Sequence, residues 1–170
     1  VIAYGQTECS PINNMTEVES SFEKQVTTVG RALPHTEVKI IDEFGEIVPV
    51  GQPGEVCSRG YCVMQGYWND PAKTQATIDK EGWLHSGDLG VMDSEGYVQI
   101  VGRIKDMIIR GGENIYPREI EEKLYTHSEI QDAAVFGVQS EKYGEEVCAW
   151  IKIRPGSTVT EDEIRHFLTE

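Results

Sequence analysis

The most regular pattern along the chain is a series of short apolar runs separated by Gly, Pro and Asp. Thr36–Asp42 alternates, with Val38 and Ile40 on one side and polar residues on the other, which is typical of a half-buried strand. Gly54–Gly60 predicts another strand, and Tyr61–Trp68 an irregular one. Short strands at this spacing predict a small β-barrel or sandwich.

Two further hydrophobic runs, Leu89–Met92 and Tyr97–Val101, flank the turn at residues 93–96 and predict a β-hairpin. Val1–Tyr4 also has the composition of a strand, whereas residues 11–29 are polar, have no clear period and are expected to form a loop. A short helix to about residue 78 is expected after Asp70, because aspartate is a good N-cap and proline suits the first helical position.

The pattern changes after residue 105. Met107–Ile109 and Asn114–Tyr116 are two β-prone runs joined by two glycines, which predicts a tight hairpin. Pro117 then opens a helix, and Ile130–Val138 and Val147–Ile153 predict strands. A capping box of the form T-x-x-E, Thr160 to Glu163, predicts the start of a final amphipathic helix. The expected fold class is α+β, with a β-barrel-like subdomain followed by a compact α/β domain.

Composition narrows the class of function. Apolar residues make up 39% of the 170 residues and charged residues 26%, which is ordinary for a globular chain. The formal net charge of −14 argues against general binding to nucleic acid or to anionic membranes. No apolar run approaches the roughly 20 residues that span a bilayer, so we expect no transmembrane segment.

The cysteine pattern and the chain ends carry weaker information. The four cysteines contain no CxxC pair, and no histidine stands at zinc-ligand spacing near them. Free thiols in a reducing compartment are expected, which favours a cytoplasmic location. The chain begins without Met in an expected strand and stops within an expected helix, so we interpret it as a fragment of a longer protein.

Two short stretches offer residue types suited to a nucleotide. In Tyr4-Gly5-Gln6-Thr7-Glu8, a tyrosine can stack on adenine, a threonine hydroxyl can donate to phosphate, and a glutamate can supply a hard oxygen ligand for Mg²⁺. In Trp83-Leu84-His85-Ser86-Gly87-Asp88, the final carboxylate can accept hydrogen bonds from two vicinal hydroxyls. A P-loop, a GxGxxG fingerprint, a GxSxG elbow and an HExxH motif are not found in the sequence.

A third stretch is the most specific. It begins Gly102-Arg103-x-Lys105-Asp106 and continues Gly111-Gly112-x-x-Ile115-x-Pro117-x-Glu119-Ile120-Glu121. With the two stretches above, in the same order, it resembles the signature motifs of the adenylate-forming enzymes. The residues around the two glycines are most similar to those of the acyl-CoA synthetase branch.

The resemblance implies roles for particular residues. Tyr4, Gly5 and Thr7 would contact the nucleotide, Glu8 would bind Mg²⁺, and Thr7 and Glu8 would belong to the catalytic set. Asp88 would hold the ribose and Arg103 the ribose and phosphates, for which a planar guanidinium is well suited.

Three more roles belong to the stretch after Arg103. Lys105, counted with the catalytic set, would be the hinge between domains. Gly111 and Gly112 would let the pantetheine arm of CoA pass close to the backbone. Tyr67 and Trp68 are assigned to packing, and His85 receives no catalytic role.

The resemblance also implies a domain plan and a reaction. Residues 1–104 would be the C-terminal part of a large domain, and residues 105–170 a truncated lid domain. The parent protein would be an ATP-dependent acyl-CoA ligase that converts a fatty or other carboxylic acid to acyl-AMP and then transfers the acyl group to CoA. The family's phosphate loop would lie upstream of Val1 and its adenylation lysine downstream of Glu170, so the isolated chain is expected to be inactive.

Two alternatives stay open at this point. One is an amino-acid or aryl-acid adenylating domain that loads a carrier protein, and the other is a non-catalytic nucleotide-binding module. The expected partners are the carboxylic acid, ATP (and its product AMP) and CoA, with a homodimer as a candidate assembly.

Overall fold

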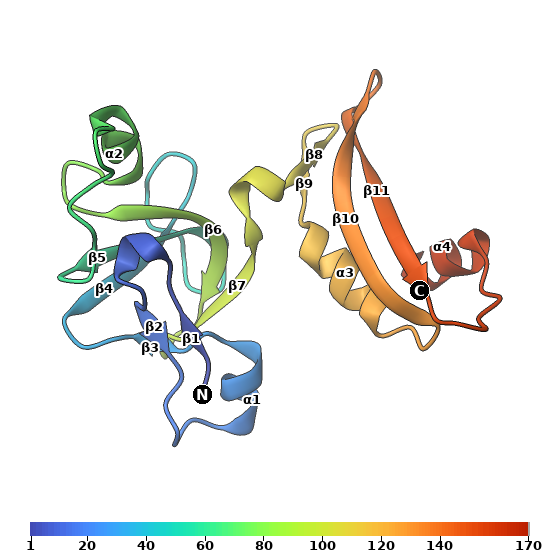
Figure 1. Cartoon of the computed structure of the whole chain (residues 1–170), viewed down its shortest axis with the longest axis horizontal. Helices are drawn as coiled ribbons and strands as arrows, with labels where there is room; N and C mark the ends of the chain where they lie inside the picture. The colour runs from blue at the N-terminus through green and yellow to red at the C-terminus, as the bar shows by residue number, and fades with distance from the viewer. Residues whose placement is uncertain (170) are drawn as a thin grey trace. The chain divides into compact units, whose positions relative to one another are not determined.

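The computed structural model of the chain describes residues 1–169 and divides into two compact units, Val1–Ile104 and Lys105–Glu170. Both units combine sheets with short helices, so the chain has the predicted α+β class (Figure 1). Each unit has its own hydrophobic core, and each is described by itself below.

The first unit opens with a small three-stranded antiparallel sheet of β1 (Ala3–Tyr4), β2 (Asn14–Met15) and β3 (Arg31–Ala32). The 3-10 helix η1 (Thr7–Cys9) lies between β1 and β2, and helix α1 (Phe22–Thr27) lies between β2 and β3. The expectation of a loop over residues 11–29 is therefore wrong in part. Ser21 caps α1 by accepting a hydrogen bond from the backbone N–H of Lys24. This N-cap was not recognised in the sequence because the segment around it is largely polar.

The main sheet of the first unit contains β4 (Thr36–Ile41), β5 (Pro53–Gly60), β6 (Leu84–Met92) and β7 (Val98–Arg103) in sequential antiparallel order. Ile40, Val56 and Val98 form a buried cluster on it. The order β4-β5-β6-β7 leaves two edges, so the sheet is open and does not close into a barrel.

The segment between β5 and β6 differs from the prediction of an irregular strand. Residues 61–68 run through turns, and the N–H of Met64 bonds to the carbonyl of Glu8 instead of to a neighbouring strand. Helix α2 (Pro71–Thr77) follows as predicted, with the Asp70 side chain accepting from the N–H of Lys73 at 2.9 Å. The β6–β7 hairpin also forms, although β6 begins five residues earlier, at Leu84.

The second unit opens with η2 (Ile104–Asp106, shared with the end of the first), and its sheet has the order β10-β11-β8-β9. Its members are β8 (Ile108–Arg110), β9 (Glu113–Ile115), β10 (Ile130–Ser140) and β11 (Gly144–Ile153). The predicted hairpin joins β8 to β9, with φ of +60° at Gly111 and +91° at Gly112. Two successive residues in the left-handed region explain why both turn positions are glycine.

Two helices pack on this sheet, α3 (Pro117–Tyr125) and α4 (Glu161–Thr169). Leu124 of α3 and Ile164 of α4 join Ile108, Ile130 and Val135 in one buried cluster. The capping box at the start of α4 forms as predicted, because Glu163 accepts from the N–H of Thr160 at 2.8 Å. Within residues 1–169, no helix combines the length and the apolar character needed to cross a membrane.

Candidate functional site

Three of the predicted site residues meet in the first unit. The hydroxyl of Tyr4, at the end of β1, donates to Oδ2 of Asp88 on β6 at 2.7 Å. Nε of Arg103, the last residue of β7, donates to Oδ1 of the same carboxylate at 2.9 Å. Asp88 and Arg103 are direct cross-strand partners in the β6–β7 ladder, so the sheet register itself brings them together.

The Asp88 carboxylate is held in a largely dry environment. Its side chain is only 10% exposed, whereas the side chain of Arg103 is 53% exposed. Burial, followed by the hydrogen bond to Asp88, raises the pKa of Tyr4, so its phenol remains a proton donor at neutral pH. A carboxylate has about four lone-pair sites, and Tyr4 and Arg103 use two of them, which leaves capacity for hydroxyl donors from a ligand.

The residues around Gly5 lie at the start of the same unit. A Cβ placed on Gly5 would meet the carbonyl oxygen of Pro11 at 2.0 Å, so close backbone packing accounts for this glycine. Thr7 is the first residue of η1, and it is exposed.

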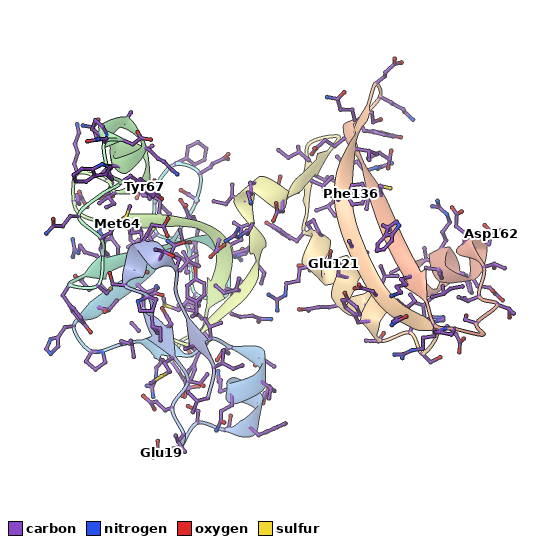
Figure 2. All side chains as sticks on the ribbon, in the orientation of Figure 1. Glu19, Met64, Tyr67, Glu121, Phe136 and Asp162 are labelled. Carbon is purple, nitrogen blue, oxygen red and sulfur yellow. The ribbon has the colours of Figure 1, made fainter. Side chains whose placement is uncertain are left out.

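Glu8 has a partner that the sequence did not reveal. Its Oε1 accepts a hydrogen bond from the hydroxyl of Tyr67 at 2.7 Å, and this bond is the main cause that lowers the pKa of the Glu8 carboxyl. Tyr67 lies between the N-terminal loop and α2, beside Lys73 (Figure 2). The assignment of Tyr67 to packing alone therefore missed its polar contact, and the same assignment for Trp68 is wrong, since that side chain is 91% exposed.

The remaining predicted site residues belong to the second unit. Lys105 is an exposed residue in the short 3-10 helix that begins this unit. Gly111 and Gly112 form the exposed turn between β8 and β9, where a Cβ on Gly112 would meet open space. Backbone conformation is thus a sufficient structural reason for the glycine at position 112.

A second polar cluster joins β5 to β6, the strand that carries Asp88. Glu55 on β5 contacts His85 on β6, with 2.8 Å between Oε2 and Nδ1, and the thiol of Cys57 lies 3.7 Å from the same nitrogen. Ligand atoms of these three side chains lie within 4.8 Å of one another, a set that could in principle hold a metal ion. However, burial raises the pKa of the Cys57 thiol to about 12, which disfavours the thiolate that binds metals.

Comparison with known proteins identifies the family. Residues 1–68 match the AMP-binding enzyme family and residues 119–170 match the AMP-binding enzyme C-terminal domain. The chain therefore belongs to the AMP-binding enzymes, the adenylate-forming superfamily expected from its motifs.

Curated relatives place it near the acyl-CoA synthetases. YngI of Bacillus subtilis, named as an acyl-CoA synthetase, is 54% identical over 98% of this chain and 30% of its own length. The medium-chain acyl-CoA ligase ACSF2 of Rattus norvegicus, named as mitochondrial, is 49% identical over 98% of this chain and 27% of its own length. The chain thus spans less than a third of either relative.

Two solved structures are similar to nearly the whole chain. ATP-bound MatB from Rhodopseudomonas palustris superimposes with a TM-score of 0.93 at 36% identity, covering 98% of this chain and 33% of MatB. The o-succinylbenzoate CoA synthetase MenE from Bacillus subtilis, in complex with its acyl-adenylate intermediate, has a TM-score of 0.87 at 32% identity and covers 98% of this chain and 34% of MenE.

Proposed function

We propose that the chain is the C-terminal part of an AMP-forming acid–thiol ligase, an acyl-CoA synthetase. The observation that carries this proposal is the meeting of Tyr4, Asp88 and Arg103 around one buried carboxylate, in a family whose members bind AMP. In the reaction, a carboxylate attacks the α-phosphate of ATP to give acyl-AMP and pyrophosphate. The thiol of CoA then attacks the acyl carbon, forming the thioester and releasing AMP.

The buried carboxylate is proposed to bind the ribose. Asp88 would accept hydrogen bonds from the two vicinal hydroxyls, with Tyr4 and Arg103 fixing the orientation of its oxygens. The exposed part of Arg103 would face the phosphates, and Tyr4, Gly5 and Thr7 would line the nucleotide. The lowered solvent access of Asp88 supports this role, because buried hydrogen bonds to a charged acceptor are stronger than exposed ones.

Glu8 is proposed as the magnesium ligand. Its carboxyl has a lowered pKa and is partly exposed, and Tyr67 occupies one oxygen, so an ionised hard oxygen remains for a cation. Bound Mg²⁺ would neutralise phosphate charge. Glu8 itself would hold the ion, and Tyr67 would hold Glu8.

The second unit is proposed to act as a lid on the larger domain. Lys105, at the boundary between the compact units, would be the hinge, and the exposed Gly111–Gly112 turn would let the pantetheine arm of CoA approach the backbone. Residues 1–104 would form the end of the large domain.

The proposed substrates follow the relatives. The rat relative is named as a medium-chain acyl-CoA ligase, which supports a fatty acid as the carboxylic acid substrate and a role in fatty acid metabolism. The four free cysteines fit a reducing compartment, and the cytoplasmic location stays a prediction beside relatives that are named mitochondrial. A homodimer also stays a prediction.

The decisive test uses the full-length protein. Acid-dependent exchange of pyrophosphate into ATP, measured across acids of different chain length, is expected together with CoA thioester formation. Exchange driven only by amino acids or aryl acids, with transfer to a carrier protein, would contradict the proposal. The 170-residue chain alone is expected to form no thioester from fatty acid, ATP and CoA, and detectable product would refute that part.

A further inference from the structure

The segment that carries Asp88 is not a regular strand. In the β5–β6 ladder, Cys57 pairs with His85 and Glu55 pairs with Leu89, so residues 86–88 stand opposite the single residue Val56. Such a bulge bends a strand and redirects its side chains. Gly87, in the middle of the bulge, has φ of +73°, a conformation that favours glycine.

A bulge interrupts the ladder, so its N–H groups need other partners. The N–H of Gly87 donates to Oε1 of Glu55 at 3.0 Å, and the N–H of Asp88 donates to the hydroxyl of Ser86 at 3.0 Å. The second oxygen of Glu55 lies 2.8 Å from Nδ1 of His85. One carboxylate on β5 therefore holds both His85, the paired residue directly before the bulge, and Gly87, the residue directly before Asp88.

The contact between Glu55 and His85 is largely shielded from solvent. The Glu55 side chain is only 18% exposed, and His85 is 30% exposed with its other nitrogen, Nε2, 3.8 Å from Oδ2 of Asp79. His85 thus lies between two carboxylates from different segments. The Glu55 contacts bridge residues 30 and 32 positions apart, so they fix the bulge relative to the sheet.

We propose that Glu55 is a positioning residue for nucleotide recognition: it anchors the 86–88 bulge so that Asp88 presents its carboxylate to the ribose hydroxyls. This inference rests on the proposed ribose role of Asp88. Glu55 makes no contact with Tyr4 or Arg103 among the hydrogen bonds of residues 1–169 and acts through the backbone of Gly87. Without it, Asp88 keeps its two side-chain partners and its pairing with Arg103 on β7, but the bulge loses its support from β5.

The experiment separates a positioning role from a merely structural one. In the full-length protein, kcat/KM for pyrophosphate exchange is measured with ATP and with 2′,3′-dideoxy-ATP, which lacks both hydroxyls that Asp88 would hold. The ratio of interest is kcat/KM with ATP divided by kcat/KM with 2′,3′-dideoxy-ATP. Glu55→Ala is expected to lower this ratio by roughly tenfold, because loss of a positioning residue weakens only the contacts between Asp88 and the ribose hydroxyls. A structural role would lower both values equally and leave the ratio unchanged, which would overturn the proposal.

Conservative variants test geometry against charge. Glu55→Gln keeps an acceptor for Gly87 and can donate to His85, so it is expected to retain the ratio. Glu55→Asp keeps the charge but is one methylene shorter, so it is expected to lower the ratio. If Glu55→Ala does not fold, this pair still decides: wild-type ratios in both variants would refute the positioning role.

Two controls make the outcome specific. Glu37→Ala removes another carboxylate from the same sheet, one paired with Arg59 at the surface, and is expected to leave the ratio unchanged. Asp88→Ala is expected to bring the ratio close to one, because the variant has no carboxylate to bind the ribose hydroxyls. If Asp88→Ala keeps the wild-type ratio, the ribose role of Asp88 fails. If Asp88→Ala loses it while Glu55→Ala and Glu55→Asp keep the wild-type ratio, only the inference about Glu55 is rejected.

Discussion

At the residue scale, the chemistry of the first unit is concentrated on a few carboxylates with specific donors. Asp88 accepts from Tyr4 and Arg103, Glu8 accepts from Tyr67, and Glu55 accepts from a backbone N–H. Each pair joins distant parts of the chain, so each donor both stabilises the fold and orients an acidic group. Removing one donor should therefore lower the free energy of unfolding, which can be measured without an activity assay.

Tyr4→Phe is expected to destabilise the chain by about 1–3 kcal/mol, because a buried charged acceptor loses a donor. Asp88 is 7% exposed, so little water can replace the phenol. Urea denaturation measures the change. Tyr61→Phe, at a side chain that is 76% exposed, is the matched control and should change stability by less than about 0.5 kcal/mol. Equal stability of the two variants would contradict this prediction.

The Glu8–Tyr67 bond predicts a pH dependence. Because the folded state lowers the pKa of Glu8, its stabilising contribution is present above the unfolded pKa of about 4.3 and is lost as pH falls through the lower folded pKa. The stability difference between the wild type and Tyr67→Phe should therefore be constant near neutral pH and shrink below about pH 4. Denaturation at several pH values measures it.

A double variant checks the cause. In a Glu8→Gln background, Tyr67→Phe should show no acid-dependent stability difference, since no carboxyl titrates at that position. A difference that shrinks equally in both backgrounds would assign the effect to other groups.

At the element scale, the turn between β8 and β9 and the bulge in β6 set the backbone geometry of the two units. Both use glycine in the left-handed region, at Gly87, Gly111 and Gly112. The β8–β9 turn joins two strands of three residues each, so its own geometry fixes the hairpin register. The bulge is instead held by the side chain of Glu55 on the neighbouring strand β5 and by the hydroxyl of Ser86 within it.

Gly112→Ala is expected to destabilise the chain by roughly 1–2 kcal/mol, because an alanine at φ of +91° is strained while its Cβ clashes with nothing. Gly102→Ala is the control, since its Cβ also meets open space but its backbone is not in the left-handed region. Thermal unfolding of both variants measures the difference, and equal melting temperatures would show that the turn tolerates alanine.

At the scale of the whole molecule, the boundary between the compact units falls between Ile104 and Lys105. This boundary lies one residue after the end of β7 at the site residue Arg103. Lys105 is the first residue after this boundary, and its hinge role stays a prediction.

Lys105→Pro tests that hinge in the full-length protein. Proline fixes φ at residue 105 and restricts the residue before it, so domain rotation should stall. Pyrophosphate exchange should be better preserved than thioester formation, and single-turnover assays of each half-reaction measure the split. Lys105→Ala, which keeps torsional freedom, is the control. Equal losses in both half-reactions for the proline variant would remove Lys105 from the hinge role.

Local sequence rules predicted much of the fold. The β8–β9 hairpin, the Asp70 cap and the capping box of α4 depend on residues that are close neighbours in the sequence, so their signals are readable directly. Helix α1 was missed because six residues with a single serine cap carry little periodicity. The irregular strand expected at residues 61–68 does not form, because backbone N–H groups of Met64 and Tyr67 donate to Glu8 and to Thr74 of α2 instead of to a neighbouring strand.

What the sequence by itself determined was the family, through three ordered motifs, and the residues Tyr4, Asp88 and Arg103 as candidates for one site. Only the tertiary structure decided how these side chains meet and which others support them. Tyr67 reaches Glu8 across 59 positions and Glu55 reaches Gly87 across 32, and no local periodicity encodes such distances. The physical reason is that a strand bulge forms only when neighbouring strands have paired. The contact between the bulge and the Glu55 carboxylate depends on the same pairing.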